Sequence, residues 1–297
     1  MADHPDFQLA QHTDGWRHIS PTPSPEALAA FYAREYYQDS HGTYAQRYSD
    51  DELAHRRLLA AELIHALGEA RGQAAGALLE IGCGEGFFLR AALDAGFEVQ
   101  GLEFSDFGLR AQHPELLDKV RFGDAFAALD QLIVERAQVD VCVMEHVLEH
   151  VADPQGLLAR LPGLLKPSGV VAITVPNDFS PVQAEARALG LIDRDFWVSP
   201  PQHLNYFNAE NLPRLLERVG FEVLDGFSSF PIDWFLHHPG SNYIADPAAG
   251  KPAHRARMAL DMLLAKNGVA AFHGFGQALF RCGAGRSITV IGRTASR

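Results

Sequence analysis

Short apolar runs alternate with segments of helical periodicity along most of the chain after Gly76. The runs expected to form strands are residues 77–81, 98–103, 119–122, 140–144, 169–175, 221–227 and 286–292. The segments expected to form helices between them are residues 86–95, 108–112, 124–136, 154–165 and 211–219. Such alternation is typical of parallel strands joined by right-handed helical crossovers. The sequence therefore predicts an α/β protein with a doubly wound, mostly parallel sheet of seven strands.

The remaining segments are expected to decorate this sheet. Residues 1–24 contain prolines but no sustained period, so we expect an irregular arm there. Helices are expected from Ser24 through Tyr36, and from Asp50 to the glycine-rich stretch that follows Leu67. The expected parts of the chain are an N-terminal arm and helical cap over 1–75, an α/β core over 76–230, an insertion or lid over 231–285 and a final core strand over 286–297. The long segments 177–202 and 231–285 are expected to be lids, and the second could also cover a partner subunit in a homodimer.

Composition excludes several classes of protein. The chain has 297 residues, of which 47% are hydrophobic and 21% charged, as in ordinary soluble globular proteins. Its net charge of −12 repels polyanions, so we expect no nucleic-acid partner. No apolar run is long enough to span a membrane, and the first 20 residues lack the features of a secretion signal. The three cysteines are far apart and suggest no disulfide framework. We therefore expect a cytoplasmic protein without a membrane partner.

A glycine loop follows the first expected strand. Gly82, Gly84 and Gly86 alternate with other residues just before a helix. Glycine is needed where the backbone turns tightly or where a ligand approaches the main chain, although an ordinary glycine-rich turn would look similar. The spacing G-x-G-x-G differs from the dinucleotide fingerprint G-x-G-x-x-G, because Phe87 stands where that fingerprint has glycine. Glu103 ends the next strand, where a carboxylate can accept hydrogen bonds from both hydroxyls of a ribose.

Taken in order, these segments resemble the class I S-adenosylmethionine-dependent methyltransferases over roughly residues 76–177. The matching pieces are Glu80-Ile81-Gly82-Cys83-Gly84-Glu85-Gly86, Glu103, Gly123-Asp124, Val139-Asp140 and Leu164-Leu165-Lys166-Pro167-Ser168-Gly169-Val170. The resemblance implies a Rossmann-like methyltransferase fold and S-adenosylmethionine as the cofactor.

The same resemblance implies roles for individual residues. The glycine loop is expected to back the methionine part of the cofactor, Glu103 to hold the ribose, and Asp124 to lie by the adenine. Glu80 is expected near the methionine amine. The complete set of cofactor-binding residues expected on this basis is Glu80, Gly82, Cys83, Gly84, Gly86, Glu103, Phe104, Asp124, Ala125 and Glu145.

A histidine-rich segment follows the fourth core strand, at the edge where open α/β sheets bind ligands. Its Leu-Glu-His-Val sequence at 148–151 is similar to that of ubiquinone-type O-methyltransferases. Glu149 and His150 could hold the loop over the cofactor, or His146 or His150 could be a general base. A third alternative is a divalent metal, which some relatives bind through Glu-x-x-Glu-His. Here His146 replaces the first carboxylate, and imidazole is a poor ligand for magnesium, so we expect no metal.

The acceptor side is expected to include the segment 200–207, which resembles a His-Leu-x-x-Phe motif of bacterial small-molecule methyltransferases. His203 is the candidate base and Tyr206 an orienting hydroxyl, although His203 could equally cap a helix or pack in the core. The tyrosines that could line the acceptor pocket are Tyr32, Tyr36, Tyr37 and Tyr44. We expect methyl transfer to a small-molecule acceptor, specifically a hydroxyl of a sugar or specialised metabolite. The alternatives are a quinone precursor or other phenol as acceptor, and a protein that binds the cofactor without catalysis.

Overall fold

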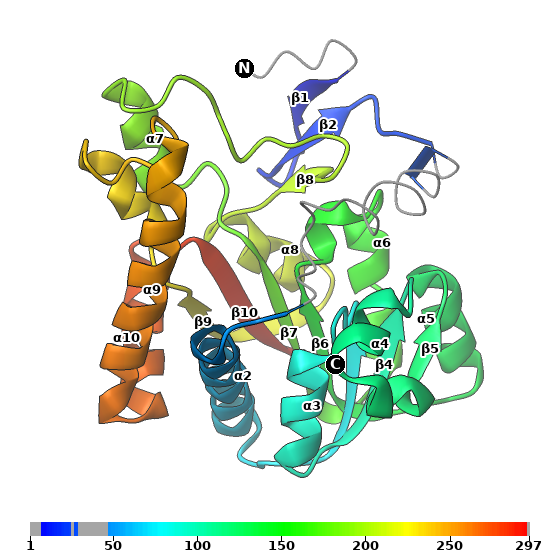
Figure 1. Cartoon of the computed structure of the whole chain (residues 1–297). Helices are drawn as coiled ribbons and strands as arrows, with labels where there is room; N and C mark the ends of the chain where they lie inside the picture. Colours follow the sequence, from blue (N-terminus) through cyan, green and yellow to red (C-terminus); the bar gives the residue numbers. More distant parts are fainter. Residues whose placement is uncertain (1–6, 25–26, 29–46, 296–297) are drawn as a thin grey trace.

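A computed structural model describes residues 7–24, 27–28 and 47–295 of the chain (Figure 1). Most of the helix expected from Ser24 to Tyr36 lies outside these residues. So do the four tyrosines expected to line the acceptor pocket.

A seven-stranded sheet forms the centre of the molecule, as the sequence predicts. Its strands are β3 (Ala77–Ile81), β4 (Glu98–Glu103), β5 (Val120–Phe122), β6 (Val139–Glu145), β7 (Leu165–Pro176), β9 (Phe221–Ser228) and β10 (Ser287–Thr294). Their spatial order is β5-β4-β3-β6-β7-β10-β9. Neighbouring strands from β5 to β7 are parallel, whereas β10 is antiparallel to both of its neighbours. The parallel carboxyl ends, together with the start of β10, therefore share one edge of the sheet.

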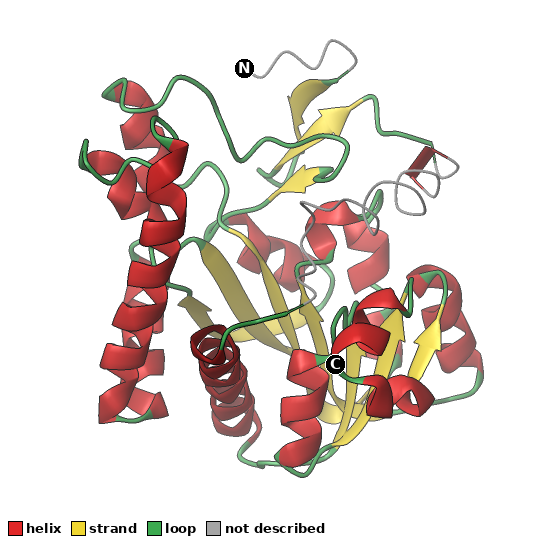
Figure 2. Cartoon of the chain, viewed as in Figure 1, coloured by secondary structure: helices red, strands yellow, loops and turns green. Residues whose placement is uncertain are grey.

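Helices cover both faces of this sheet (Figure 2). The α-helices of the described residues are α2 (Asp50–Arg71), α3 (Phe87–Asp94), α4 (Phe107–Gln112), α5 (Ala125–Val134), α6 (Pro154–Leu158), α7 (Pro181–Ala188), α8 (Asn211–Arg218), α9 (Gly250–Leu264) and α10 (Val269–Arg281). Successive strand residues face opposite sides: Leu78 packs in the apolar cluster with α2 and α3, and Leu79 in the cluster with α5, α6 and α8. Both faces of the sheet are buried, which explains the continuous apolar runs in the sequence.

Two local expectations were wrong. Residues 1–24 were expected to be irregular, but β1 (Gln8–Gln11) and β2 (Arg17–Ser20) pair as an antiparallel hairpin, which β8 (Asn205–Tyr206) extends. Burial of Trp16 and Ile19 stabilises this small sheet. A helix was expected over 154–165, but α6 ends at Leu158 and a 3-10 turn containing Pro162 precedes β7. Proline has no N–H to donate, so the helix cannot continue there.

The insertion 231–285 is mainly helical and lies beside α2 and the edge strand β9 (Figure 1). Helix α2 starts with a capping box formed by Ser49 and Glu52, and it packs on α3 and β7. The part of the expected cap that α2 supplies is therefore a layer of the core. Among the described residues, no helix is long and apolar enough to cross a membrane.

Buried polar pairs hold the insertion in place. His273 of α10 contacts Asp225 of β9 at 2.9 Å and Glu62 of α2 at 3.5 Å. His55 of α2 contacts Asp261 of α9 at 2.8 Å, and both side chains are at most 5% exposed. Such pairs fix the geometry of the helices they join, because separating either partner would leave a buried charge.

We expect the stability of the protein to fall between about pH 7 and 10, because His273 is held in its charged form. Burial alone would lower the pKa of His273, but the Asp225 and Glu62 carboxylates raise it to about 9. In the unfolded chain this pKa is about 6.5. The stabilisation is thus complete below that pH and is lost as the pH rises through about 9. Thermal midpoints should fall more steeply with pH for the wild type than for His273→Gln, and parallel curves would contradict this account.

Candidate active site

The glycine loop joins β3 to α3 at the carboxyl edge of the sheet. Gly82, Gly84 and Gly86 have positive φ angles of 75°, 52° and 80°, which glycine adopts without strain. A Cβ atom on Gly82 would lie 2.2 Å from Cγ2 of Val147, and one on Gly86 would lie 2.5 Å from Cδ1 of Leu109. The loop therefore leaves no room for other residues at these two positions.

Three acidic residues end or nearly end adjacent strands around this loop. Glu80 lies in β3, Glu103 ends β4 and Glu145 ends β6. Glu80 is 3% exposed, and its Oε2 has no hydrogen-bond partner among the described residues. Burial raises the pKa of Glu80 well above its usual range, and the charges of Glu145 and Glu103 add to this effect. A cationic ligand that donates hydrogen bonds would relieve both the repulsion and the unpaired oxygen.

Glu103 is positioned by backbone donors on both sides. Its Oε2 accepts a hydrogen bond from the N–H of Gly84 at 2.7 Å, and its Oε1 accepts one from the N–H of Phe104 at 2.7 Å. The N–H of Ser105 also donates to Oε1, at 3.4 Å. The carboxylate is thus rigidly placed where the sequence predicts contact with a ribose.

Two exposed aromatic side chains lie at or just after the ends of β4 and β5. Phe104, which follows β4, is 46% exposed, and Phe122 at the end of β5 is 43% exposed. Asp124 caps α5 by accepting a hydrogen bond from the N–H of Ala127 at 2.8 Å, so Ala125 begins the helix beside it. Exposed rings of this kind suit a flat, partly apolar ligand group. Sequence reasoning missed Phe122, whose place at the end of a strand was the available signal.

Cys83 lies within the glycine loop and is 5% exposed. Burial raises the pKa of its thiol far above the usual range, with the nearby glutamates adding to the shift. The side chain is therefore an uncharged, unreactive part of the core, and only its backbone belongs to the loop that faces the cleft.

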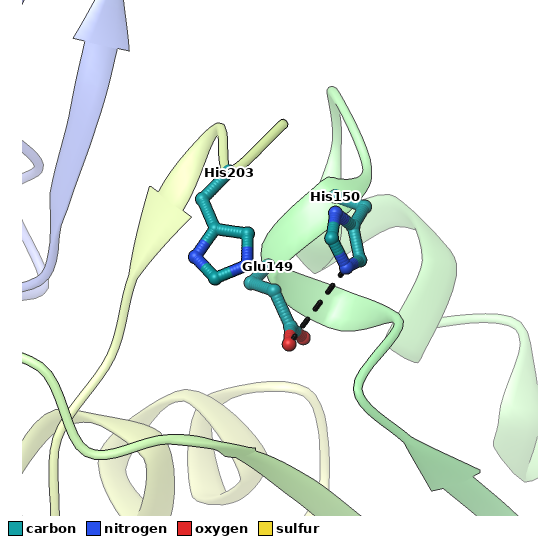
Figure 3. Close-up of side chains that lie close together, drawn as sticks. All are labelled: Glu149, His150 and His203. Atoms are coloured by element: carbon teal, nitrogen blue, oxygen red, sulfur yellow. Dashed lines mark ion pairs between the residues drawn. The ribbon is translucent and has the colours of Figure 1, made fainter. Parts of the chain in front are cut away.

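The two histidine segments meet at the acceptor side of the edge. Glu149 and His150 lie in a 3-10 turn after β6, and His203 precedes β8. The N–H of Leu204 donates to the carbonyl of Glu149 at 2.8 Å, which holds the segments together. A carboxylate oxygen of Glu149 and one ring nitrogen each of His150 and His203 lie within 4.8 Å of one another (Figure 3). The sequence predicts each segment at this edge, and the structure shows that they form one cluster.

The centre of this cluster is the buried Glu149 carboxylate. Burial would raise its pKa, but a hydrogen bond from His146 and the charges of His150, His146 and His203 hold it at about 2. His150 donates through Nδ1 to the carbonyl of Gln202 at 2.6 Å, so its Nε2 faces Oε1 of Glu149 at 3.9 Å. Glu149 is thus a negative charge that orients the imidazoles around it.

His203 is a neutral imidazole in this cluster. Burial lowers the pKa of His203 to about 4, which leaves the ring neutral at neutral pH. Its ring lies edge-on to that of His150, with the centroids 4.9 Å apart. Its Nδ1 is buried and has no hydrogen-bond partner in the described part of the chain. The ring therefore keeps hydrogen-bonding capacity that none of the described residues uses.

Tyr206 has a different role from the one expected. Its side chain is 1% exposed, and its hydroxyl donates to the carbonyl of His203 at 3.0 Å. The hydroxyl therefore holds the turn that carries His203 and does not face an acceptor. This correction makes Tyr206 a positioning residue.

One carboxylate and two imidazoles could together hold a divalent transition metal, whereas magnesium prefers oxygen ligands. The sequence predicts no metal. We accordingly expect that dialysis against a chelator leaves any methyl transfer by the protein unchanged. Loss of transfer that zinc or manganese restores would contradict this expectation and would make Glu149, His150 and His203 the metal ligands.

Comparison with known proteins identifies the class to which this site belongs. A family model described as a methyltransferase domain matches residues 53–225. The chain belongs to the methyltransferase domain family. The match includes the glycine loop, the three acids around it and the histidine cluster, and it confirms the resemblance seen in the sequence.

Curated relatives narrow the class further. The chain is 33% identical over 158 residues to a probable S-adenosylmethionine-dependent methyltransferase of Mycolicibacterium smegmatis. The matched segment covers 52% of this chain and 54% of that protein. The chain is 31% identical over 131 residues to a ubiquinone biosynthesis O-methyltransferase of Caulobacter vibrioides, covering 42% of this chain and 50% of that protein. The chain thus spans about half the length of these methyltransferases.

Two solved structures share the methyltransferase fold. An S-adenosylmethionine-dependent methyltransferase from Archaeoglobus fulgidus has a TM-score of 0.51 at 20% identity, covering 80% of this chain and 94% of that one. The 1,6-didemethyltoxoflavin-N1-methyltransferase of Burkholderia thailandensis has a TM-score of 0.51 at 14% identity, covering 97% of this chain and 100% of that one. At these identities the likeness concerns the fold alone, and it confirms the Rossmann-like methyltransferase architecture.

A contact between α2 and the glycine loop of this methyltransferase domain was missed from the sequence. The Arg56 guanidinium lies 4.3 Å from the ring centroid of Tyr48 and 4.6 Å from that of Phe87. The Tyr48 hydroxyl is 2.7 and 2.8 Å from the two carboxylate oxygens of Glu85, a residue of the loop. No spacing in the sequence indicates this contact, because it joins residues that are far apart in the chain.

Gly82→Ala is expected to destabilise this loop. The left-handed backbone costs about 1 to 2 kcal/mol for a residue with a Cβ atom, and the collision with Val147 adds to that cost. The thermal midpoint and the affinity for S-adenosylhomocysteine should both fall. Gly96→Ala is the matched control, because Gly96 also has a positive φ, 92°, but open space around it. Equal effects of the two substitutions would contradict the tight loop described here.

Proposed function

We propose that the protein transfers a methyl group from S-adenosylmethionine to a hydroxyl of a small-molecule acceptor. The observation that carries the proposal is the glycine loop in a methyltransferase domain, flanked by Glu103 and by Glu80, whose Oε2 has no hydrogen-bond partner among the described residues. When bound, S-adenosylmethionine supplies a methyl group on a positively charged sulfur that is an excellent leaving group.

The loop and the acids around it fit this cofactor. Glu103, which backbone donors hold at the end of β4, would accept hydrogen bonds from the ribose hydroxyls. Glu80 would accept one from the methionine ammonium, which would also satisfy its orphaned oxygen. Phe104 and Phe122 would cover the adenine, with Asp124 at its edge.

The histidine cluster would activate the acceptor. His203 would accept the hydroxyl proton at a ring nitrogen as the oxygen takes the methyl group, and Glu149 would stabilise the charged imidazolium electrostatically. The main task of the site is to hold the acceptor oxygen in line with the methyl carbon at close distance. A sugar hydroxyl needs such a base more than a phenol does, because its pKa is far above neutral.

The chemistry of the acceptor is the finer part of the proposal. We favour a hydroxyl of a sugar or specialised metabolite, in a protein that acts in the cytoplasm. A quinone precursor or another phenol is the second candidate, and the names of relatives such as the O-methyltransferase of Caulobacter vibrioides support it.

Incubation with methyl-labelled S-adenosylmethionine and an extract of source cells tests the proposal. Label should appear in small molecules and should survive conditions that hydrolyse esters, as expected for an ether. Label in protein or nucleic acid would contradict the small-molecule acceptor. Cofactor binding without any label would favour a protein that binds the cofactor without catalysis.

A further inference from the structure

Glu85 is a buried acid within the glycine loop, and none of the proposed contacts with the cofactor uses it. It lies between Gly84 and Gly86, and its side chain is 7% exposed. Removing a carboxylate from water is costly unless hydrogen bonds and an opposite charge replace its hydration. The partners of Glu85 therefore indicate what an acid at this position does for the loop.

Two residues from the α2 side hold the Glu85 carboxylate. The hydroxyl of Tyr48, which directly precedes the N-cap residue of α2, lies 2.8 Å from Oε1 and 2.7 Å from Oε2. Nη2 of Arg56, in the second turn of α2, lies 3.7 Å from Oε2. Burial raises the pKa of Glu85, whereas the Tyr48 hydrogen bond and the charges of Arg56 and His113 lower it. Each of these partners thus favours the ionised form of the side chain.

Aromatic contacts fix the same two residues against the next helix. Phe87 follows Gly86 and begins α3. Its ring meets that of Tyr48 edge-on, with the centroids 5.4 Å apart. The Arg56 guanidinium lies over both rings, 4.3 Å from the Tyr48 centroid and 4.6 Å from the Phe87 centroid, and such cation–π contacts are attractive. Tyr48 and Arg56 therefore have contacts that hold them in place without the Glu85 carboxylate.

The main chain of Glu85 has a separate anchor. Nδ1 of His113, the residue after α4, lies 2.7 Å from the Glu85 carbonyl oxygen. The N–H of Gly86 donates to the carbonyl of Cys83 at 2.8 Å, which closes the turn of the loop. Loss of the carboxylate contacts would thus loosen the loop without unfolding it.

The proposed ribose contact does not depend on Glu85. Glu103 accepts a hydrogen bond from one loop residue, through the N–H of Gly84 at 2.7 Å. It accepts others from the N–H of Phe104 at 2.7 Å and from that of Ser105 at 3.4 Å, and both of these residues lie outside the loop. Glu103 would therefore keep its place in a loosened loop. The methionine part of the cofactor, which the loop is expected to back, would lose its contacts.

The composition of the loop makes such an anchor useful for binding. Three of the five residues from Gly82 to Gly86 are glycines, and glycine loses the most conformational freedom when a chain becomes ordered. A ligand that has to order the loop binds more weakly by that cost. A loop that the protein already holds in the binding conformation does not impose this cost on the ligand.

We propose that Tyr48 and Arg56 are positioning residues, which hold the Glu85 carboxylate and thereby keep the glycine loop in the conformation that binds the methionine part of S-adenosylmethionine. Neither residue needs to contact the cofactor. Helix α2 would then take part in cofactor binding through Glu85. This inference rests on the placement of the cofactor in the proposed function, and it is independent of the acceptor.

Calorimetric titration of the full chain with two ligands tests the proposal. The ligands are S-adenosylhomocysteine and methylthioadenosine, which lacks the amino-acid part. Tyr48→Phe removes only the hydroxyl, because the ring keeps its contacts with Arg56 and Phe87. This variant should bind S-adenosylhomocysteine more weakly by about fivefold or more, the usual range for coupled sites. Its affinity for methylthioadenosine should equal that of the wild type.

Further variants separate positioning of the loop from other effects. Arg56→Met removes the charge that faces Glu85 and should also weaken the binding of S-adenosylhomocysteine alone. Arg57→Met is the matched control, because Arg57 is exposed at the next position of α2, and it should bind both ligands as the wild type does. The double variant Tyr48→Phe/Glu85→Ala should bind S-adenosylhomocysteine no more weakly than Glu85→Ala, because both substitutions break the same contact.

Three results would overturn the proposal. The first is unchanged binding of S-adenosylhomocysteine by Tyr48→Phe. The second is an equal loss of affinity for the two ligands, which would indicate general destabilisation of the site. The third is a double variant whose loss is the sum of the two single losses. Absence of methyl transfer by the wild type would instead contradict the proposed function alone, because these titrations need no acceptor.

Discussion

Glu103→Ala should weaken the binding of S-adenosylmethionine by about 10- to 100-fold. A hydrogen bond to a charged group contributes about 1.5 to 3 kcal/mol, and each 1.4 kcal/mol corresponds to about a tenfold change in affinity. The substitution removes the ribose contacts proposed for both oxygens. It also releases the N–H groups of Gly84 and Phe104, which the carboxylate holds in place. Calorimetric titration with the cofactor and with S-adenosylhomocysteine measures the loss directly.

A control on the same strand makes this result specific. Glu98 begins β4 and is exposed, so Glu98→Ala removes the same charge from the protein at a distance from the cleft. Its cofactor affinity should equal that of the wild type. If Glu103→Ala also bound the cofactor normally, the end of β4 would not be the ribose site, and the proposed placement of the cofactor would be wrong.

His203→Ala should lower turnover by about 10²- to 10⁴-fold, the usual contribution of a general base. The cofactor affinity should not change, because the glycine loop and its acids lie on other elements. Single-turnover transfer at saturating cofactor is the appropriate measurement, since it reports the chemical step. The effect should be largest for an alkyl hydroxyl and smaller for a phenol, whose proton is lost more easily.

Two further variants help to interpret the turnover measured for His203→Ala. Tyr206→Phe removes the hydroxyl that holds the His203 turn, and we expect a smaller fall in turnover from this variant than from His203→Ala. His238→Ala changes an exposed histidine of the insertion and should leave turnover intact. Unchanged turnover in His203→Ala would remove this residue from the mechanism.

The sheet was predictable because a strand that is buried on both faces is a run of consecutive apolar residues. Residues such as Leu78 and Leu79, which are adjacent and both buried, are explained only by a strand covered on two sides. The glycine loop was predictable for a similar reason. Its positive φ angles require glycine at fixed positions. In both cases the constraint acts on residues that are close together in the sequence.

Features that depend on distant partners were harder to predict. The hairpin of β1 and β2 is made of four-residue strands, and its extension by β8 could not be seen in the polar, proline-containing sequence of residues 1–24. The proximity of Glu149 to His203 arises from a backbone hydrogen bond between segments about 50 residues apart. The burial of Tyr206 and the contact between Tyr48 and Glu85 also follow from tertiary packing.

The central claim is that the cleft at the carboxyl edge of the sheet binds S-adenosylmethionine. The most direct measurement is calorimetric titration of the purified chain with S-adenosylmethionine, repeated with NADH. We expect one equivalent of S-adenosylmethionine to bind and no heat from NADH, because the G-x-G-x-G loop lacks the third glycine of the dinucleotide fingerprint. Binding of NADH, or no binding of S-adenosylmethionine at millimolar concentration, would contradict the account.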